Sequence, residues 1–144
     1  MRNIVHNGFD VKDIQKHLSL ISNQYTPELQ ADPLYSQPRH VFRITRLYRK
    51  NGTLVDLGGG ISVHNGVLAQ MGMKVSVVDL LGEYWERKAS EPTSIDHEVK
   101  VLKACGVRFI PQEVASCDLT QYFADSSVDV VTSFHCLEHL HQSP

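Results

Sequence analysis

The sequence predicts an α/β fold with a doubly wound parallel sheet, and two observations support this prediction. From residue 53 onward, short runs rich in β-branched residues alternate with helix-like segments. The first run, Thr53–Leu57, leads into three consecutive glycines, Gly58, Gly59 and Gly60, and then into a helix-like stretch over Val63–Met71. Strand, tight turn and helix in this order form the unit from which parallel sheets are built.

Composition excludes several classes of protein. The chain has 144 residues, 42% of them hydrophobic, which indicates one domain with a core of useful size. A net charge of −2 offers no electrostatic basis for binding nucleic acid or a membrane surface. The apolar runs are too short to span a bilayer, and the N-terminus lacks the apolar segment of a signal peptide. We therefore expect neither a nucleic acid nor a membrane as partner.

The cysteines bear on the compartment. They are Cys105, Cys117 and Cys136, an odd number without a Cys-x-x-Cys pair. This pattern indicates neither a disulfide framework nor a zinc site, and it favours a reducing, cytoplasmic location.

The residues before the first strand predict helices. Asp10 is placed to cap a helix over Val11–Ile21, and Pro38 suits the first turn of a second helix over Arg39–Lys50. The segment between them, Asn23–Gln37, contains prolines and predicts a loop.

The second helix has two contrasting faces. Arg39, Arg43, Arg46 and Lys50 fall on one side, and Val41, Ile44 and Tyr48 fall on the other. One interpretation is a solvated basic face over a core stripe. The other is a lid helix that steers an acidic substrate.

Further elements follow the first strand and helix. Strands are expected at Lys74–Leu81, Val107–Ile110 and Val128–Ser133, a short extended piece near Val114–Ser116, a helical turn at Glu83–Lys88, and helices at Ile95–Cys105 and Cys136–His141.

The glycines suggest a ligand site. A dinucleotide-binding turn requires Gly-x-Gly-x-x-Gly, and here Gly58 and Gly60 match while the third position is Val63. Asp56 lies at the carboxyl end of the first strand, where it would repel a pyrophosphate but suit an ammonium or sulfonium group. Its alternative role is to cap the turn by accepting from backbone amides.

Two further acids follow later strands. Asp79 ends the second strand, 21 residues after Gly58, where a carboxylate can accept hydrogen bonds from ribose hydroxyls. Asp118 follows the third strand region and could accept from an adenine amino group. Either acid could instead be an ordinary exposed or loop aspartate.

The glycine turn with Asp56 is followed along the chain by Asp79, by Asp118 and by a segment from Asp129 to Leu140 that ends in Leu137-Glu138-His139-Leu140. This order of motifs resembles that of class I S-adenosylmethionine-dependent methyltransferases. The small-molecule type related to quinone-biosynthesis enzymes is the most similar subgroup, and the resemblance covers about residues 38–144. It implies a Rossmann-like fold, S-adenosyl-L-methionine as cofactor, and O- or N-methylation of a small-molecule acceptor such as a sugar, phenol or quinone-like compound.

The resemblance also implies which residues contact the cofactor. They are Asp56, Gly58, Gly59 and Gly60 at the methionine end, Asp79 and Leu80 at the ribose, Asp118 and Leu119 at the adenine, and Ser133 and Phe134 beside the transferred methyl group. Ser62 stands where the family has its last glycine, and its small hydroxyl suits a helix cap.

The segment His135-Cys136-Leu137-Glu138-His139 contains the candidate general bases. His139 and His135 are the residues we expect to accept a proton, because imidazole titrates near neutrality. Read literally, the segment is the His-x-x-Glu-His zinc-peptidase motif, but only five residues follow His139 and a further ligand is needed downstream. Some related methyltransferases hold a divalent ion with Glu-x-x-Glu-His here, to which His141 could add. Glu138 could instead interact with a helix N-terminus. We assign no metal ligand.

The family's sheet has seven strands, whereas this chain ends just after the fourth. We therefore expect an N-terminal helical lid or cap segment, 1–52, and an incomplete cofactor-binding domain, 53–144. The fourth strand would leave an apolar edge, so we expect an oligomer or a partner chain to cover it. Two other functions stay open: a cofactor-binding fragment without catalytic activity, and an NAD-dependent oxidoreductase, which Val63 and Asp56 disfavour.

Overall fold

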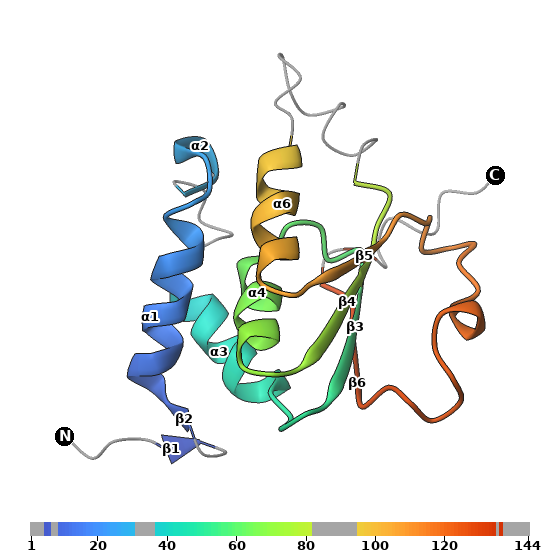
Figure 1. Ribbon diagram of the computed structural model, residues 1–144, viewed down its shortest axis with the longest axis horizontal. Coiled ribbons are helices and arrows are strands. Elements are labelled where there is room, and N and C mark those ends of the chain that lie inside the picture. The colour runs from blue at the N-terminus through green and yellow to red at the C-terminus, as the bar shows by residue number, and fades with distance from the viewer. Residues whose placement is uncertain (1–4, 7–8, 31–36, 82–94, 135, 137–144) are drawn as a thin grey trace.

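The computed structural model describes residues 5–6, 9–30, 37–81, 95–134 and 136 (Figure 1). Its strands are β1 (Val5–His6), β2 (Phe9–Asp10), β3 (Thr53–Leu57), β4 (Lys74–Val78), β5 (Arg108–Ile110) and β6 (Val130–Thr132). Its helices are α1 (Val11–Ser22), α2 (Pro27–Gln30), α3 (Gln37–Leu47), α4 (Val63–Gln70), α6 (Asp96–Ala104) and the 3-10 turn η2 (Leu119–Gln121).

Four parallel strands form the central sheet in the order β5-β4-β3-β6. β3 lies in the middle, with Leu57 opposite Val78 of β4 and Asp56 opposite Thr132 of β6. The carboxyl ends of β3, β4 and β6 therefore meet at one edge of the sheet. The chain leaves β3 toward β4 and returns on the other side at β6, so the point where the strand order reverses lies between β3 and β6. Such points are where open α/β sheets bind ligands. The predicted Rossmann-like α/β fold is confirmed.

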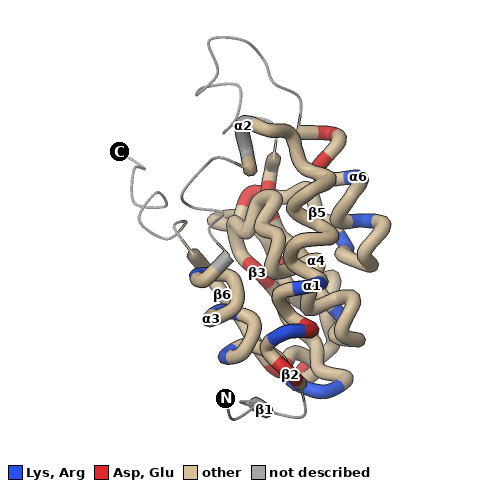
Figure 2. Tube along the Cα trace, turned by 90° about the vertical axis from the view of Figure 1, so that its left-hand side faces the viewer, with Lys and Arg blue, Asp and Glu red and all other residues tan. Residues whose placement is uncertain are grey.

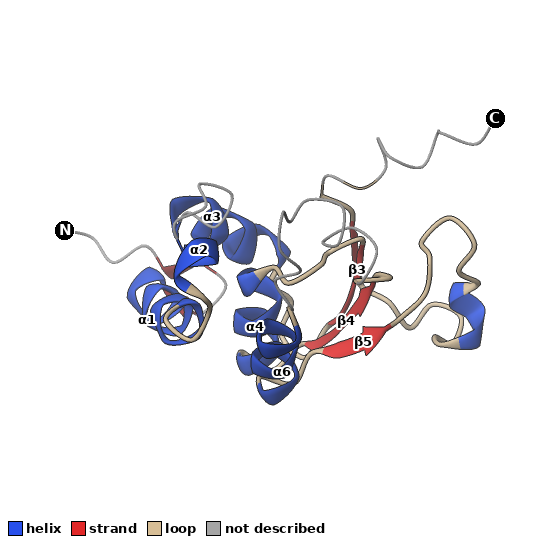
Figure 3. Cartoon of the chain, turned by 90° about the horizontal axis from the view of Figure 1, so that it is seen from above, coloured by secondary structure: helices blue, strands red, loops and turns tan. Residues whose placement is uncertain are grey.

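The two faces of the sheet are covered differently. Leu54, Val75 and Val77 belong to a core shared with α4 and α6. Val55, Val78 and Ile110 face the opposite way and pack against the segment that connects β5 to β6, which contains η2. Seen from above, the helices lie on one side of the sheet and this connection lies on the other (Figure 3).

The N-terminal helices share the main core. Ile14, Leu18 and Ile21 of α1 are buried together with Ile44 and Tyr48 of the α3 region. Burying an aliphatic side chain of this size contributes roughly 1.5–3 kcal/mol, so this contact is a large part of the fold's stability. The predicted cap of α1 is also confirmed, since the Lys12 amide donates to Asp10 Oδ1 at 2.9 Å.

Three local predictions were wrong. β1 and β2 form an antiparallel hairpin where only helix was expected, because strands of two residues are too short to show a period. The segment expected to be a loop contains α2, since Pro27 occupies a first helical position, where its missing amide costs nothing. Val114–Ser116 forms a turn, with the Ser116 amide donating to Glu113 O, rather than an extended piece.

Other expectations concern the surface and the segments outside the described residues. Lys and Arg are spread over α1, α3 and α6, and α1 and α6 also carry acidic residues, whereas α3 has none (Figure 2). In the part of the chain that the structure describes, no helix is both long and apolar enough to cross a membrane. The helical turn expected at Glu83–Lys88 lies outside the described residues, as does the helix expected over Cys136–His141 except for its first residue.

Candidate functional site

The glycine turn (Gly58–Gly60) joins β3 to the residues that start α4. Gly58 and Gly60 have φ angles of +67° and +53°, which residues with a side chain rarely adopt. A Cβ atom on Gly59 would overlap the carboxylate of Asp56, and one on Gly58 would overlap the side chain of Cys136. The turn therefore lies directly against its neighbours, and each of its positions has a reason to be glycine.

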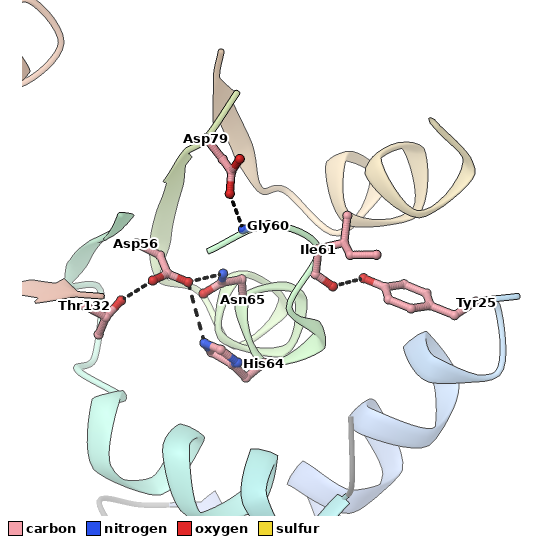
Figure 4. A network of polar contacts seen from close by, with 8 residues as sticks. All are labelled: Tyr25, Asp56, Gly60, Ile61, His64, Asn65, Asp79 and Thr132. Carbon is pink, nitrogen blue, oxygen red and sulfur yellow. Dashed lines mark hydrogen bonds and ion pairs between the residues drawn. The ribbon is translucent and has the colours of Figure 1, made fainter. Parts of the chain in front are cut away.

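Asp56 lies beneath this turn and is 0% exposed. Thr132 Oγ1 of β6 donates to its Oδ1 at 2.8 Å, and Asn65 Nδ2 of α4 donates to its Oδ2 at 2.7 Å (Figure 4). One carboxylate thus ties β3, β6 and α4 together at the strand ends. These partners are side chains, not the backbone amides that the capping alternative envisaged.

Burial and nearby charges change the pKa values of Asp56 and His64. Burial raises the pKa of Asp56, while hydrogen bonds from Asn65 and Thr132 and the positive charge of Arg43 act in the opposite direction. His64 Nε2 lies 3.8 Å from Asp56 Oδ2, which is too long for a hydrogen bond. Burial, followed by the nearby His40 and Arg43, lowers the pKa of His64 well below its usual value. His64 is therefore neutral, and Arg43 acts on Asp56 through its charge rather than through a hydrogen bond.

Asp79 follows β4 and reaches the glycine turn directly. Its Oδ2 accepts from the Gly60 amide at 2.9 Å, and its Oδ1 accepts from the Leu81 amide at 2.8 Å. Leu80 lies beside it with an exposed side chain. The acid expected at the ribose and the turn expected at the methionine end are thus brought together (Figure 4).

The residues after β6 complete this edge. The guanidinium carbon of Arg43 lies 3.9 Å from the centre of the Phe134 ring, a cation–π contact from α3. The ring of His64 meets the ring of Phe134 edge-on at 5.7 Å, and His40 lies 5.6 Å from His64. Ser133 is half-buried. α3 therefore supplies one wall of the site.

This arrangement refines the two interpretations of α3. Ile44 and Tyr48 are buried, as the core stripe predicted, while Val41 is only half-buried. Arg46 is exposed, but Arg43 is half-buried and turns toward Phe134. A purely solvated basic face is thus wrong for Arg43.

Asp118 and Leu119 lie on the segment that connects β5 to β6. Asp118 is exposed and caps η2, accepting from the Thr120 amide at 3.0 Å and from its hydroxyl at 2.6 Å. These hydrogen bonds lower the pKa of Asp118. Leu119 packs into the second core with Val55 and Val78. No contact between Asp118 and the glycine turn is recorded among the described residues, so their shared role at a cofactor stays a prediction.

The candidate bases His135 and His139 lie outside the described residues, as do Glu138 and His141. Within the described part of the chain, no three His, Cys, Asp or Glu residues gather in a way that could hold a metal ion. The metal alternative is therefore untested.

Sequence reasoning missed four residues of the site. All four are buried: Asn65 and Thr132 donate to Asp56, and the His64 ring lies against Phe134 with His40 beside it. A signal existed for two of them: Asn65 is a polar residue within the apolar face of α4, and His40 lies one helical turn before the core residue Ile44. Their convergence on Asp56 and Phe134 needed the three-dimensional structure.

The geometry suits a ligand with an adenosine group. The turn allows close approach of the backbone, and an acid at the end of the neighbouring strand lies within hydrogen-bond distance of the turn. Comparison with known families identified one match: a family model described as a methyltransferase domain matches residues 55–144. Searches of curated proteins and of solved structures found no significant match.

Proposed function

Because the chain belongs to the methyltransferase-domain family, whose members use S-adenosylmethionine, we propose that it methylates a small-molecule acceptor at oxygen or nitrogen. The proposed site lies beyond the carboxyl ends of β3, β4 and β6. Open parallel sheets bind ligands at such a position, where the strand order reverses.

One observation supports this proposal most strongly, namely the 2.9 Å hydrogen bond from the Gly60 amide to Asp79 Oδ2. It brings the glycine turn next to an acid that can accept from ribose hydroxyls. In the proposal, Gly58, Gly59 and Gly60 lie under the methionine end and Asp79 holds the ribose with Leu80 beside it.

Asp56 has an indirect part in this proposal. Its carboxylate is buried and hydrogen-bonded to Thr132 and Asn65, so it shapes the turn from below. Its negative charge also favours a cationic ligand above the turn, through the field rather than through contact.

The proposed methyl transfer requires no covalent bond between the protein and the reactants. The cofactor, when bound, supplies a methyl group that its sulfonium already activates. The protein's part is to align the acceptor with that group and to exclude water. Phe134, braced by Arg43 and His64, would form the apolar wall beside the acceptor, with Ser133 next to it. His139 or His135 would take the acceptor's proton, and Asp118 and Leu119 would contact the adenine.

We also propose that further protein covers the sheet edge formed by β6. β6 is an edge strand in the described sheet, and its Val131 side chain is 59% exposed. An exposed apolar edge favours pairing with further protein, which supports an oligomer or a partner chain at this place.

The test is a methyl-transfer assay with S-adenosylmethionine carrying a labelled methyl group. Purified protein is incubated with panels of phenols, quinols, sugars and small amines, and products are read by mass spectrometry. Transfer to one panel identifies the acceptor class. Cofactor binding without transfer to any panel would support the cofactor-binding alternative instead, and absence of binding would contradict the proposal.

A further inference from the structure

Tyr25 lies at the end of the α1 region, far along the chain from the glycine turn, yet it contacts the residues that follow the turn. Its hydroxyl donates to the backbone carbonyl of Ile61 at 2.7 Å (Figure 4). Both residues are buried. Ile61 comes directly after Gly60 and directly before Ser62, the N-cap of α4.

The peptide group between Ile61 and Ser62 is hydrogen-bonded on both sides, to Tyr25 through its carbonyl and to the glycine turn through its amide. In a trans peptide the carbonyl and the amide point in opposite directions, and the described chain contains no cis peptide. The Ser62 amide, on the far side of the Ile61 carbonyl, donates to Gly59 O at 3.3 Å. The Ile61–Ser62 peptide is therefore held between Tyr25 and Gly59.

Tyr25 is itself held in place by α1. α1 runs along α4 in the opposite direction: His17 Nδ1 lies 2.9 Å from Gln70 Oε1, and a Cβ on Gly66 would lie 3.1 Å from Ile21 Cδ1. Tyr25 continues this series to the start of α4. The contact with Ile61 is thus the last in a row of contacts and not an isolated surface bond.

From these contacts we infer that Tyr25 is a positioning residue for the cofactor site, acting through the Ile61–Ser62 peptide on the glycine turn. The inference rests on the proposed function, since it requires that the turn hold the cofactor. Without the hydroxyl, the buried Ile61 carbonyl loses this donor, and the Ile61–Ser62 peptide is held only by the hydrogen bond from the Ser62 amide to Gly59 O. The turn would then have to be ordered by the ligand, at a cost in affinity.

The experiment compares Tyr25→Phe with wild type by calorimetric titration of S-adenosylhomocysteine, the demethylated product. Tyr48→Phe is the matched control, because Tyr48 is also a buried core tyrosine but its ring packs on Phe9, at 4.5 Å, instead of on the turn. We expect the Kd to rise about three- to tenfold for Tyr25→Phe and to change less than about twofold for Tyr48→Phe. Thermal melts confirm that both variants are folded at the titration temperature.

The outcomes separate this inference from the proposed function. If wild type fails to bind the product, the proposed function fails. If wild type binds and Tyr25→Phe binds equally well, only the role of Tyr25 is overturned. A purely structural role for Tyr25 would lower the melting temperature without changing the Kd.

A measurement on wild type covers the case in which Tyr25→Phe does not fold. Hydrogen exchange of the ligand-free protein should show the Ser62 amide protected as strongly as the amides of α4, since the peptide is held on both sides. Exchange of Ser62 through frequent local opening, much faster than that of α4, would overturn the inference.

Discussion

Several titratable side chains near the site are buried, so the free energy of unfolding should depend on pH. His40 and His64 are enclosed beside Arg43, and burial, helped by the arginine charges, lowers the pKa of His40 from 6.5 to about 4. Burial also lowers the pKa of His64, whereas it raises that of Asp56. The histidines thus remain neutral in the folded protein at a pH where they are protonated in the unfolded chain.

Stability should therefore fall as the pH is lowered from about 6.5 toward 4. As the pH falls, His40 is protonated in the unfolded chain before it is protonated in the folded protein. The contribution of His40 to the stability of the folded protein is therefore fully present above pH 6.5 and is lost progressively below it. Between pH 7 and 5 this amounts to about 2 kcal/mol for His40 alone. His64 adds a loss of the same sign. Asp56 opposes both near the acid end, since its raised pKa means that proton uptake there favours the folded state.

Urea unfolding at pH 7 and pH 5 measures this loss. His40→Phe should lose about 2 kcal/mol less between the two pH values than wild type does. Equal losses in His40→Phe and wild type would mean that His40 does not stay neutral.

Gly59 offers a second test at the residue scale. A Cβ there would overlap the Asp56 carboxylate, which Thr132 and Asn65 hold in place. Gly59→Ala should cost roughly 1–3 kcal/mol of stability and should also weaken cofactor binding. Gly72→Ala is the matched control: its φ of +95° makes alanine strained, but nothing lies within 4 Å of its Cβ. It should lower stability in urea unfolding while leaving the titration of S-adenosylhomocysteine unchanged. Equal binding by Gly59→Ala and wild type would contradict this account of the turn.

At the scale of elements, the packing of α1 on α4 connects the N-terminal helices to the site. Ile21 is fully buried against Gly66, whose missing side chain lets the two helices approach. Tyr25 extends the same contact to Ile61. Any loosening of α1 should therefore reach the residues that follow the glycine turn.

Two neighbouring residues of α1 test the packing of this helix. Ile21→Ala should destabilise the protein by about 2–5 kcal/mol, since it leaves a cavity in the main core. Leu20→Ala changes a side chain that is 54% exposed and should stay within about 0.5 kcal/mol of wild type. Denaturant unfolding of both variants provides the comparison, and similar losses in the two would show that α1 does not pack as described.

At the scale of the whole molecule, the sequence was sufficient to predict the parallel sheet and the edge at which its polar residues meet. β3, β4, α4 and α6 were predictable because their periodic patterns and glycine stops are local. The meeting of Asp79 with the glycine turn followed from the topology, because the ends of neighbouring parallel strands share one edge.

What the sequence could not predict depends on contacts between distant segments. The hydrogen bonds of Asp56 to Thr132 and of Tyr25 to Ile61 join residues 76 and 36 positions apart, and no local pattern encodes them. The half-buried position of Arg43 arises in the same way, because Phe134, two residues after β6, contacts it.

The central claim is that the glycine turn and Asp79 together hold S-adenosylmethionine. Calorimetric titration of S-adenosylhomocysteine into wild type, Asp79→Asn and the control Asp13→Asn, an exposed acid of α1, tests it most directly. We predict one-to-one binding by wild type and by Asp13→Asn, and at least about tenfold weaker binding by Asp79→Asn. A folded wild-type protein that binds neither S-adenosylhomocysteine nor S-adenosylmethionine, or an Asp79→Asn variant that binds as well as wild type, would contradict the claim.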